Sequence, residues 1–196
     1  MDIAVLASGS GSNLQALIDT TNLGADISLV ITDRPGAGAL TRAKAAGIKT
    51  AVIPYSDFVD RDHFSAAIAT KAKEAGAEAL VLAGFMRILA PVAIVRFPNR
   101  ILNIHPSLLP AFPGAHAIAQ ALAYGVKTTG VTVHFVDEEV DHGPIIAQTP
   151  VSVVVGDNEQ SLRKRIQLEE HKLYPKVVAA FAAGRIDVVG REVIWR

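Results

Sequence analysis

The sequence contains no cysteine among its 196 residues, few aromatic residues (6%), and no excess of charge of either sign. The lack of cysteine excludes disulfide bonds and thiolate metal sites, and it fits a reducing, cytoplasmic environment. Nineteen basic residues balance nineteen acidic ones, so the charge gives no support for binding to nucleic acid or to a membrane surface. No apolar run approaches the length of a transmembrane helix, and the short, acidic N-terminus is not that of a signal peptide.

The sequence does contain enough apolar residues to form one ordinary domain. Half of the residues are hydrophobic, and a chain of this length can bury a full core. It shows no internal repeat and no low-complexity linker. We therefore expect a single domain over residues 1–196.

Short apolar strands alternate with helical segments through the first half of the chain. The expected strands are 3–7, 27–31, 50–53, 79–83 and 101–104, and the expected helices begin near Ser12, Ala39, Asp60 and Pro91. Such alternation predicts a parallel sheet that is covered on both faces.

The pattern changes in the second half. A helix over 117–123 precedes two strands, 131–136 and 144–151, whose short connection predicts an antiparallel pair. Tyr174-Pro175 is expected to break the next helix in two, and residues 185–195 to form a terminal hairpin. The sequence therefore predicts an α/β, Rossmann-like fold, with a mostly parallel twisted sheet of about seven strands, an antiparallel late strand, and helices on both faces.

Asn103 and His105 lie where the fifth strand ends in a proline-containing loop. Residues two apart on a strand point to the same face, and ligands bind beside the carboxyl ends of parallel strands. An amide donor next to an imidazole can stabilise an oxyanion and transfer a proton. The same two side chains also fit a strand end where they satisfy local backbone groups, so this pattern alone leaves both interpretations open.

Residues 8–13 (SGSGSN) form a glycine-rich loop between the first strand and the first helix. Glycines and the free N–H groups of a helix N-terminus favour a phosphate. No lysine follows as in a P-loop, and Leu14 occupies the third glycine position of a dinucleotide fingerprint. Asp33, at the end of the second strand, still resembles the acid that binds ribose in dinucleotide sites. The loop predicts a phosphate monoester more strongly than NAD, and a glycine turn capped by Ser12 or Asn13 stays open.

Asp141 lies in the loop between the two late strands, where a carboxylate can orient an imidazole or hold a water molecule, or can simply stabilise the turn. Residues 84–89 follow the fourth strand and reach the same edge as Asn103. Arg87 in this segment is a candidate contact for an anion, or a solvated surface residue. The remaining histidines lack metal-ligand spacing, so no metal is expected, and they are interpreted as core or surface residues: His63, His116, His134, His142 and His171.

Four segments in this order resemble the phosphoribosylglycinamide formyltransferase family, which belongs to the formyltransferase-fold superfamily. They are 8–13 (SGSGSN), 83–89 (AGFMRIL), 103–110 (NIHPSLLP) and 141–144 (DHGP), and the resemblance covers nearly the whole chain. It implies transfer of a formyl group from 10-formyltetrahydrofolate, a co-substrate, to the amine of glycinamide ribonucleotide in purine biosynthesis. We also expect a cytoplasmic monomer or homodimer that acts on small molecules, without nucleic acid, membrane or metal.

The resemblance also assigns roles by position. Its catalytic group is Asn103, His105 and Asp141. The substrate phosphate would bind backbone groups of Gly11, Ser12 and Asn13, with Glu170 at the ribose hydroxyls. The folate would lie against Met86, Arg87, Ile88, Leu89, Asn103 and the 137–141 loop with Val140, and Arg61 would lie near its glutamate tail. Gln167 and Ala111 stand where some relatives carry basic residues, which affects binding rather than chemistry.

Three alternatives are weighed against this interpretation. A formyltetrahydrofolate hydrolase uses the same Asn, His and Asp on water, but usually carries an extra N-terminal domain, whereas the first strand here starts at residue 2. A methionyl-tRNA formyltransferase needs a C-terminal RNA-binding domain and a basic surface, and we expect neither from this sequence. A non-catalytic nucleotide-binding module would use Gly9, Gly11 and Asp33, but it leaves the set of Asn103, His105 and Asp141 unexplained.

Overall fold

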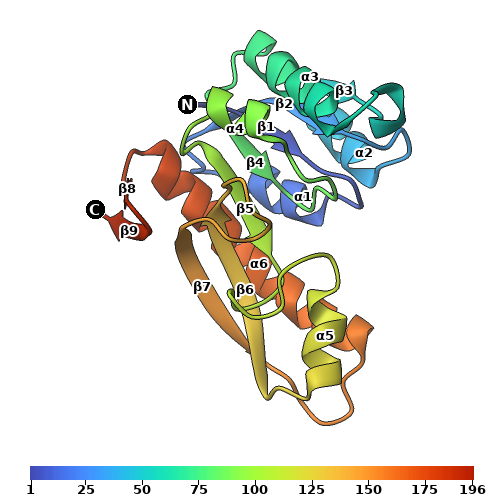
Figure 1. Ribbon diagram of the computed structural model, residues 1–196, viewed down its shortest axis with the longest axis vertical. Helices are drawn as coiled ribbons and strands as arrows, with labels where there is room; N and C mark the ends of the chain where they lie inside the picture. The colour runs from blue at the N-terminus through green and yellow to red at the C-terminus, as the bar shows by residue number, and fades with distance from the viewer.

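The computed structural model describes residues 1–196 and contains a seven-stranded sheet with helices on both faces (Figure 1). Its strands are β1 (Asp2–Leu6), β2 (Asp26–Thr32), β3 (Thr50–Val52), β4 (Ala79–Leu82), β5 (Ile101–His105), β6 (Thr128–Phe135) and β7 (Ile145–Ser152). Their order is β3-β2-β1-β4-β5-β6-β7. The first five strands run parallel, while β6 is antiparallel to both β5 and β7. The predicted fold class is therefore confirmed.

The helices form two layers, and each layer packs on one apolar face of the sheet. The helices are α1 (Ser12–Ile18), α2 (Gly38–Ala45), α3 (Arg61–Glu74), α4 (Pro91–Arg96), α5 (Ala117–Tyr124) and α6 (Glu159–Ala182), with the 3-10 helix η1 (Tyr55–Asp57) before α3. One apolar cluster joins α1, α2, α5 and α6 to one face, and α6 passes behind β5 and β6 in Figure 1. A second cluster joins α3 and α4 to the other face but extends no further than β5. That face of β6 and β7 is therefore left without a helix.

Helix α6 is continuous, so the prediction that Tyr174-Pro175 breaks it is wrong. Pro175 cannot donate the hydrogen bond that a helix needs at this position. Tyr174, however, is fully buried, and its hydroxyl donates to the carbonyl oxygens of Leu82 (2.8 Å) and Leu102 (3.1 Å) beneath the sheet. Pro175 is itself buried in the helix. Packing and this hydrogen bond outweigh the missing backbone bond, so the helix continues through the proline.

The Tyr174 hydroxyl is a testable anchor of α6. We expect Tyr174→Phe to lower the free energy of unfolding by about 1 kcal/mol, because a buried hydrogen bond is lost while the ring is kept. Urea unfolding followed by circular dichroism measures the change. Tyr124→Phe, at a residue that is 80% exposed, is the matched control. A Tyr174→Phe midpoint equal to that of the control would contradict this role.

The chain ends in the predicted hairpin of β8 (Ile186–Val189) and β9 (Glu192–Trp195). The hairpin lies beside β7, and the indole N–H of Trp195 donates to the carbonyl of Ile146 (3.0 Å) (Figure 1). None of the helices has a stretch that is long and apolar enough to cross a membrane.

Candidate functional site

Three polar side chains lie on the same side of the sheet as α3 and α4, over the part that these helices do not cover. They are Asn103, His105 and His134. Asn103 of β5 is paired with His134 of β6, so the two side chains emerge side by side from the same face. His105, two residues after Asn103, shares that face. The polar residues alternate with the apolar Leu102 and Ile104, which belong to the core on the other side of the sheet. The alternation of side chains along β5 thus places the candidate site on one face of the sheet and the core on the other.

The loop over residues 136–144 folds across this face and brings Asp141 to the cluster. Its carboxylate lies 3.3 Å from Nδ1 of His105, 3.4 Å from Nδ2 of Asn103 and 3.7 Å from Nε2 of His134. The structure therefore brings together Asn103, His105 and Asp141, as the sequence predicts. Asp141 reaches this cluster across the face of β5 and β6 and contacts His105, the last residue of β5.

His134 holds the Asn103 amide in one orientation. Nδ1–H of His134 donates to the carbonyl of Phe135 (2.7 Å), because a carbonyl only accepts. Nε2 then carries a lone pair and accepts from Nδ2 of Asn103 (3.1 Å). His134 is 2% exposed, so this contact is shielded from water. The sequence interpretation of His134 as an ordinary core or surface residue missed it, because only the register of two strands far apart in sequence places it beside Asn103.

His105 is held at both ring nitrogens. Nε2–H donates to the carbonyl of Phe112 (2.9 Å), and Nδ1 faces Asp141. Burial lowers the pKa of His105, although the nearby Asp141 carboxylate opposes this effect. His105 is therefore neutral at pH 7, with its proton on Nε2 and a free lone pair on Nδ1. Such an imidazole can accept a proton, and Asp141 stabilises the cation that results.

Asp141 is kept ionised. Burial alone would raise its pKa, but contact with the His134 imidazole, the hydrogen bond from the N–H of Gly114 (2.7 Å) and the nearby His105 imidazole together lower the pKa of Asp141 below its usual value. The residue has a positive φ of 53°, which an L-residue adopts at a cost when the surrounding structure holds it there. The C-terminal hairpin is part of that surrounding structure, since the Arg191 guanidinium donates to the carbonyl of His142 (2.7 Å).

Asn13 and Glu170 form a second buried cluster, on the face of the sheet that α1 and α6 cover. Nδ2 of Asn13 donates to Oε2 of Glu170 (2.9 Å), and each residue is 7% exposed. Burial raises the pKa of Glu170, against the opposing effects of Asn13 and Arg163. Oδ1 of Asn13 is buried without a hydrogen-bond partner. An amide oxygen of this kind can accept a hydrogen bond from a hydroxyl group.

The glycine-rich loop adjoins this pair. Gly11 precedes α1 with φ 74°, and a Cβ there would lie 2.7 Å from Cα of Ala39. Only glycine therefore fits between α1 and α2 at this point. A hollow of about 420 Å³ borders the loop, lined in part by Ser12, Arg42 and His171.

The buried Glu170 carboxylate has a consequence for stability. Because its pKa is raised in the folded protein, ionisation of Glu170 favours unfolding, and stability is lost as the pH rises through the folded pKa. We expect Glu170→Gln to raise Tm at pH 7 by about 3 °C, which corresponds to about 1 kcal/mol for a protein of this size. The gain should vanish below pH 4, where the unfolded carboxyl is protonated. Thermal unfolding at both pH values, with Glu169→Gln as control, checks this, and an equal Tm for wild type and Glu170→Gln at pH 7 would contradict it.

Residues 84–89 lie next to Asn103, because Leu82 at the end of β4 is paired with Asn103. The predicted folate residues differ in exposure. Met86 (59%) and Ile88 (49%) are exposed, as is Val140 (47%) in the loop of Asp141. Leu89 is instead buried in the core, and Arg87 forms an ion pair with Asp33. Exposed apolar side chains grouped beside a polar cluster are typical of a ligand-binding surface.

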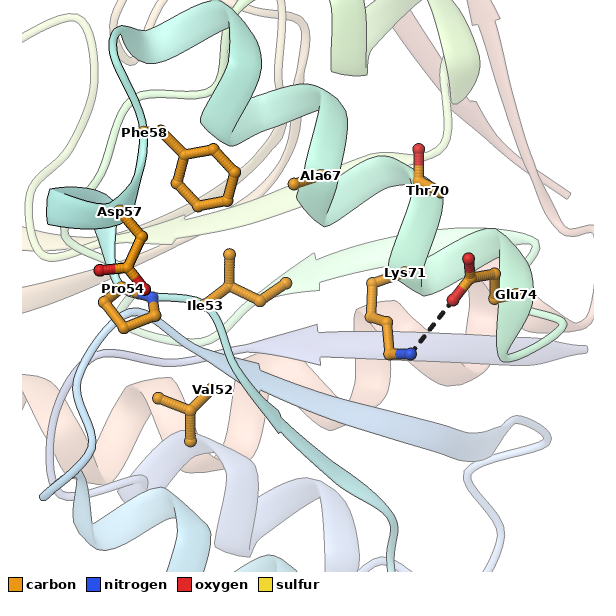
Figure 2. Close-up of a pocket in the computed structure, with 9 residues that line it drawn as sticks. All are labelled: Val52, Ile53, Pro54, Asp57, Phe58, Ala67, Thr70, Lys71 and Glu74. Carbon is orange, nitrogen blue, oxygen red and sulfur yellow. Dashed lines mark hydrogen bonds and ion pairs between the residues drawn. The ribbon is translucent and has the colours of Figure 1, made fainter.

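Arg61, predicted near a glutamate tail, is the exposed first residue of α3. A separate hollow of about 390 Å³ lies between β3, η1 and α3. Figure 2 shows that Val52, Ile53 and Phe58 line it, with the Lys71–Glu74 ion pair (3.1 Å) at one side. It contains none of the predicted site residues. In the whole chain, no group of three or more His, Cys, Asp or Glu residues is arranged to hold a metal ion.

Comparison with known proteins decides the family. A family model described as formyl transferase matches residues 1–178. The chain belongs to the formyl transferase family.

Several relatives of this formyl transferase are named for a particular reaction. The chain is 43% identical over 191 residues to the phosphoribosylglycinamide formyltransferase of Escherichia coli K12, and the match covers 96% of this chain and 90% of that protein. The crystal structure of glycinamide ribonucleotide transformylase 1 from Symbiobacterium toebii matches 100% of this chain and 93% of its own, with a TM-score of 0.97 and 46% identity. The trifunctional purine biosynthetic protein adenosine-3 of Drosophila melanogaster is 46% identical over 187 residues, but this chain spans only 14% of its length.

Proposed function

We propose that this formyl transferase moves a formyl group from 10-formyltetrahydrofolate to the amine of glycinamide ribonucleotide in purine biosynthesis. The observation that carries the proposal is the cluster of Asn103, His105 and Asp141 on an open sheet face, beside the exposed Met86 and Ile88. The named relatives of similar length supply the substrate class. We expect a cytoplasmic monomer or homodimer, which needs neither nucleic acid nor a membrane.

The two substrates would approach the cluster from different sides. The ribonucleotide phosphate would bind the backbone N–H groups of Gly11, Ser12 and Asn13, and the Asn13–Glu170 pair would bind the ribose hydroxyls. The folate would lie along the segment 86–89, Asn103 and Val140, with its glutamate tail toward Arg61. This arrangement is supported by the exposure of Met86, Ile88 and Val140 and by the unpartnered Oδ1 of Asn13.

The proposed reaction is a direct transfer. The glycinamide amine attacks the formyl carbon, and the formyl oxygen becomes an oxyanion. One Nδ2–H of Asn103 stays on His134 while the other exchanges its contact with Asp141 (3.4 Å) for this oxygen, and Nε2–H of His105 exchanges the Phe112 carbonyl for it. The amine loses a proton, which a water molecule held by Asp141 carries to the folate nitrogen as the bond from that nitrogen to the formyl carbon breaks. This reaction requires neither a covalent enzyme intermediate nor a metal.

Positioning is expected to supply more of the rate than any single donor. Holding two reactants in attack geometry can lower a barrier by about 7–11 kcal/mol, whereas one oxyanion donor is worth about 2.7–4 kcal/mol. Asn103 fits the second role, because the contact with His134 holds one of its N–H groups and so fixes the direction of the other.

One contact argues against the alternative that the protein is a non-catalytic nucleotide-binding module. The Asp33 side chain is 0% exposed and pairs with Arg87 (2.8 Å), so its carboxylate is not available to a ribose.

Isothermal titration calorimetry tests the proposed function at the level of binding. We expect glycinamide ribonucleotide and tetrahydrofolate each to bind at a 1:1 ratio and NADH not to bind. Binding of NADH without binding of tetrahydrofolate would overturn the proposed function.

A further inference from the structure

Arg87 lies within the segment proposed to form the folate pocket, yet its guanidinium group is held from outside that segment. Nε of Arg87 donates to Oδ2 of Asp33 at 2.8 Å, and Cζ lies 4.8 Å from the centre of the Tyr55 ring. Asp33 follows β2 directly, and Tyr55 begins η1. The sequence interpretation gave Arg87 as a candidate contact for a bound anion. In the structure its guanidinium group instead contacts Asp33 and Tyr55 of the chain itself.

The Asp33 carboxylate depends on this contact. Its side chain is 0% exposed, and Oδ1 has no hydrogen-bond partner, so the charge has little solvation of its own. A buried charge that loses its partner is strongly destabilising. The second nearby cation, Nε of Arg34, lies 3.9 Å away on a side chain that is 58% exposed. Arg87 is therefore the main countercharge, and Asp33 holds it firmly in return.

The backbone around this segment is attached on either side of Arg87. Oγ of Ser8 accepts from the N–H of Met86 (2.9 Å), and Oγ of Ser65 accepts from the N–H of Ala90 (2.9 Å). Between these two points, the Arg87 side chain ties the segment to β2 and η1. Met86 and Ile88, on either side of Arg87, are the exposed apolar residues proposed to contact the folate. Fixing Arg87 thus restricts how both of its neighbours can move.

We propose that Asp33 and Tyr55 are positioning residues for the folate donor: they clamp Arg87 so that Met86 and Ile88 stay arranged for binding. The inference rests on the proposed function, because it takes the segment 84–89 as the wall of the folate pocket. It assigns Arg87 a role through the loop and not through contact with a folate carboxylate. It also gives Asp33, which the reaction itself does not use, a role in donor affinity.

The test separates the clamp from direct contact. Asp33→Asn leaves every side chain of the segment in place but removes the charge that holds Arg87. We expect this variant and Arg87→Met each to raise KM for 10-formyltetrahydrofolate by about 5- to 10-fold, the cost of re-ordering a released segment. kcat should stay within about twofold, because Asn103, His105 and Asp141 are untouched. Arg34→Met removes a charge near the same carboxylate without touching the segment, and should leave KM unchanged.

A double variant separates positioning from loss of stability. Arg87→Met leaves the buried Asp33 charge unpaired and should lower Tm, whereas Asp33→Asn/Arg87→Met should regain most of that Tm while KM stays raised. If KM recovers together with Tm, the effect is one of stability alone and the proposal is overturned. If Asp33→Asn leaves KM unchanged while Arg87→Met raises it, Arg87 contacts the folate directly, and the proposal is again overturned.

Hydrogen exchange gives a readout that does not depend on activity. The amides of residues 86–89 should exchange faster in Asp33→Asn and Arg87→Met than in wild type or Arg34→Met, and equal exchange rates would overturn the clamp. Tetrahydrofolate binding by wild type is measured first by calorimetry. Absence of binding would overturn the proposed function, whereas the exchange rates would still decide whether Asp33 anchors the segment.

Discussion

Replacing His105 with alanine should lower kcat for formyl transfer by about 10³-fold while the protein stays folded. The variant loses both an oxyanion donor, worth about 10²–10³ in rate, and the group that Asp141 is placed to assist. KM for either substrate should change little, because the proposed binding contacts lie on other residues. Steady-state release of tetrahydrofolate at saturating ribonucleotide measures kcat, and circular dichroism reports the fold.

His63→Ala is the matched control for this experiment. Its imidazole is 67% exposed and pairs with Asp60 at the start of α3, away from Asn103 and Asp141. It should keep the wild-type kcat. A His105→Ala enzyme that turns over within tenfold of wild type would show that His105 has no chemical role.

Gly143→Ala should reduce kcat by about 100-fold although no proposed catalytic side chain is altered. A Cβ at Gly143 would lie 2.0 Å from the carbonyl oxygen of Phe135, so the backbone must shift where the N–H of Phe135 donates to Pro144 (2.9 Å) and closes the loop. Asp141 lies two residues before Gly143. A displacement of about 1 Å at a reacting group can cost 10²-fold in rate.

Hydrogen exchange at Gly114 shows whether the loop has moved, because this amide donates to Oδ2 of Asp141. It should exchange faster in Gly143→Ala than in wild type. Gly36→Ala is the control, since Gly36 is exposed and a Cβ there meets nothing within 4 Å. Wild-type kcat in Gly143→Ala would mean that the position of Asp141 does not limit the rate.

Asn103 and His105 could be predicted because the relation between them is local. Residues two apart on one strand share a face, and the end of a strand in an α/β sheet is a known place for ligands. His134 could not be predicted in this way. Its place beside Asn103 depends on the register between β5 and β6, in which Asn103 is paired with a residue 31 positions further along the chain. Asp141 was predicted through resemblance, and only the folded loop shows that it crosses the face of the sheet.

The elements whose bounds follow from apolar periodicity were predicted correctly. The prediction failed where one tertiary contact determines the local structure. The strands and most helices follow from continuous or periodic apolar runs. Pro175 indicates a break by local rules, but the buried Tyr174 hydroxyl and the sheet above it keep α6 whole. Arg87 is a similar case, because the sequence cannot show that the carboxylate of Asp33 reaches it across 54 positions.

The central claim is tested most directly by following tetrahydrofolate release from 10-formyltetrahydrofolate with and without glycinamide ribonucleotide. If the claim is correct, release requires the ribonucleotide, and one formylated ribonucleotide forms for each tetrahydrofolate released. Release at the same rate without the ribonucleotide would make water the acceptor and the protein a hydrolase. No release in either mixture would contradict catalysis by Asn103, His105 and Asp141.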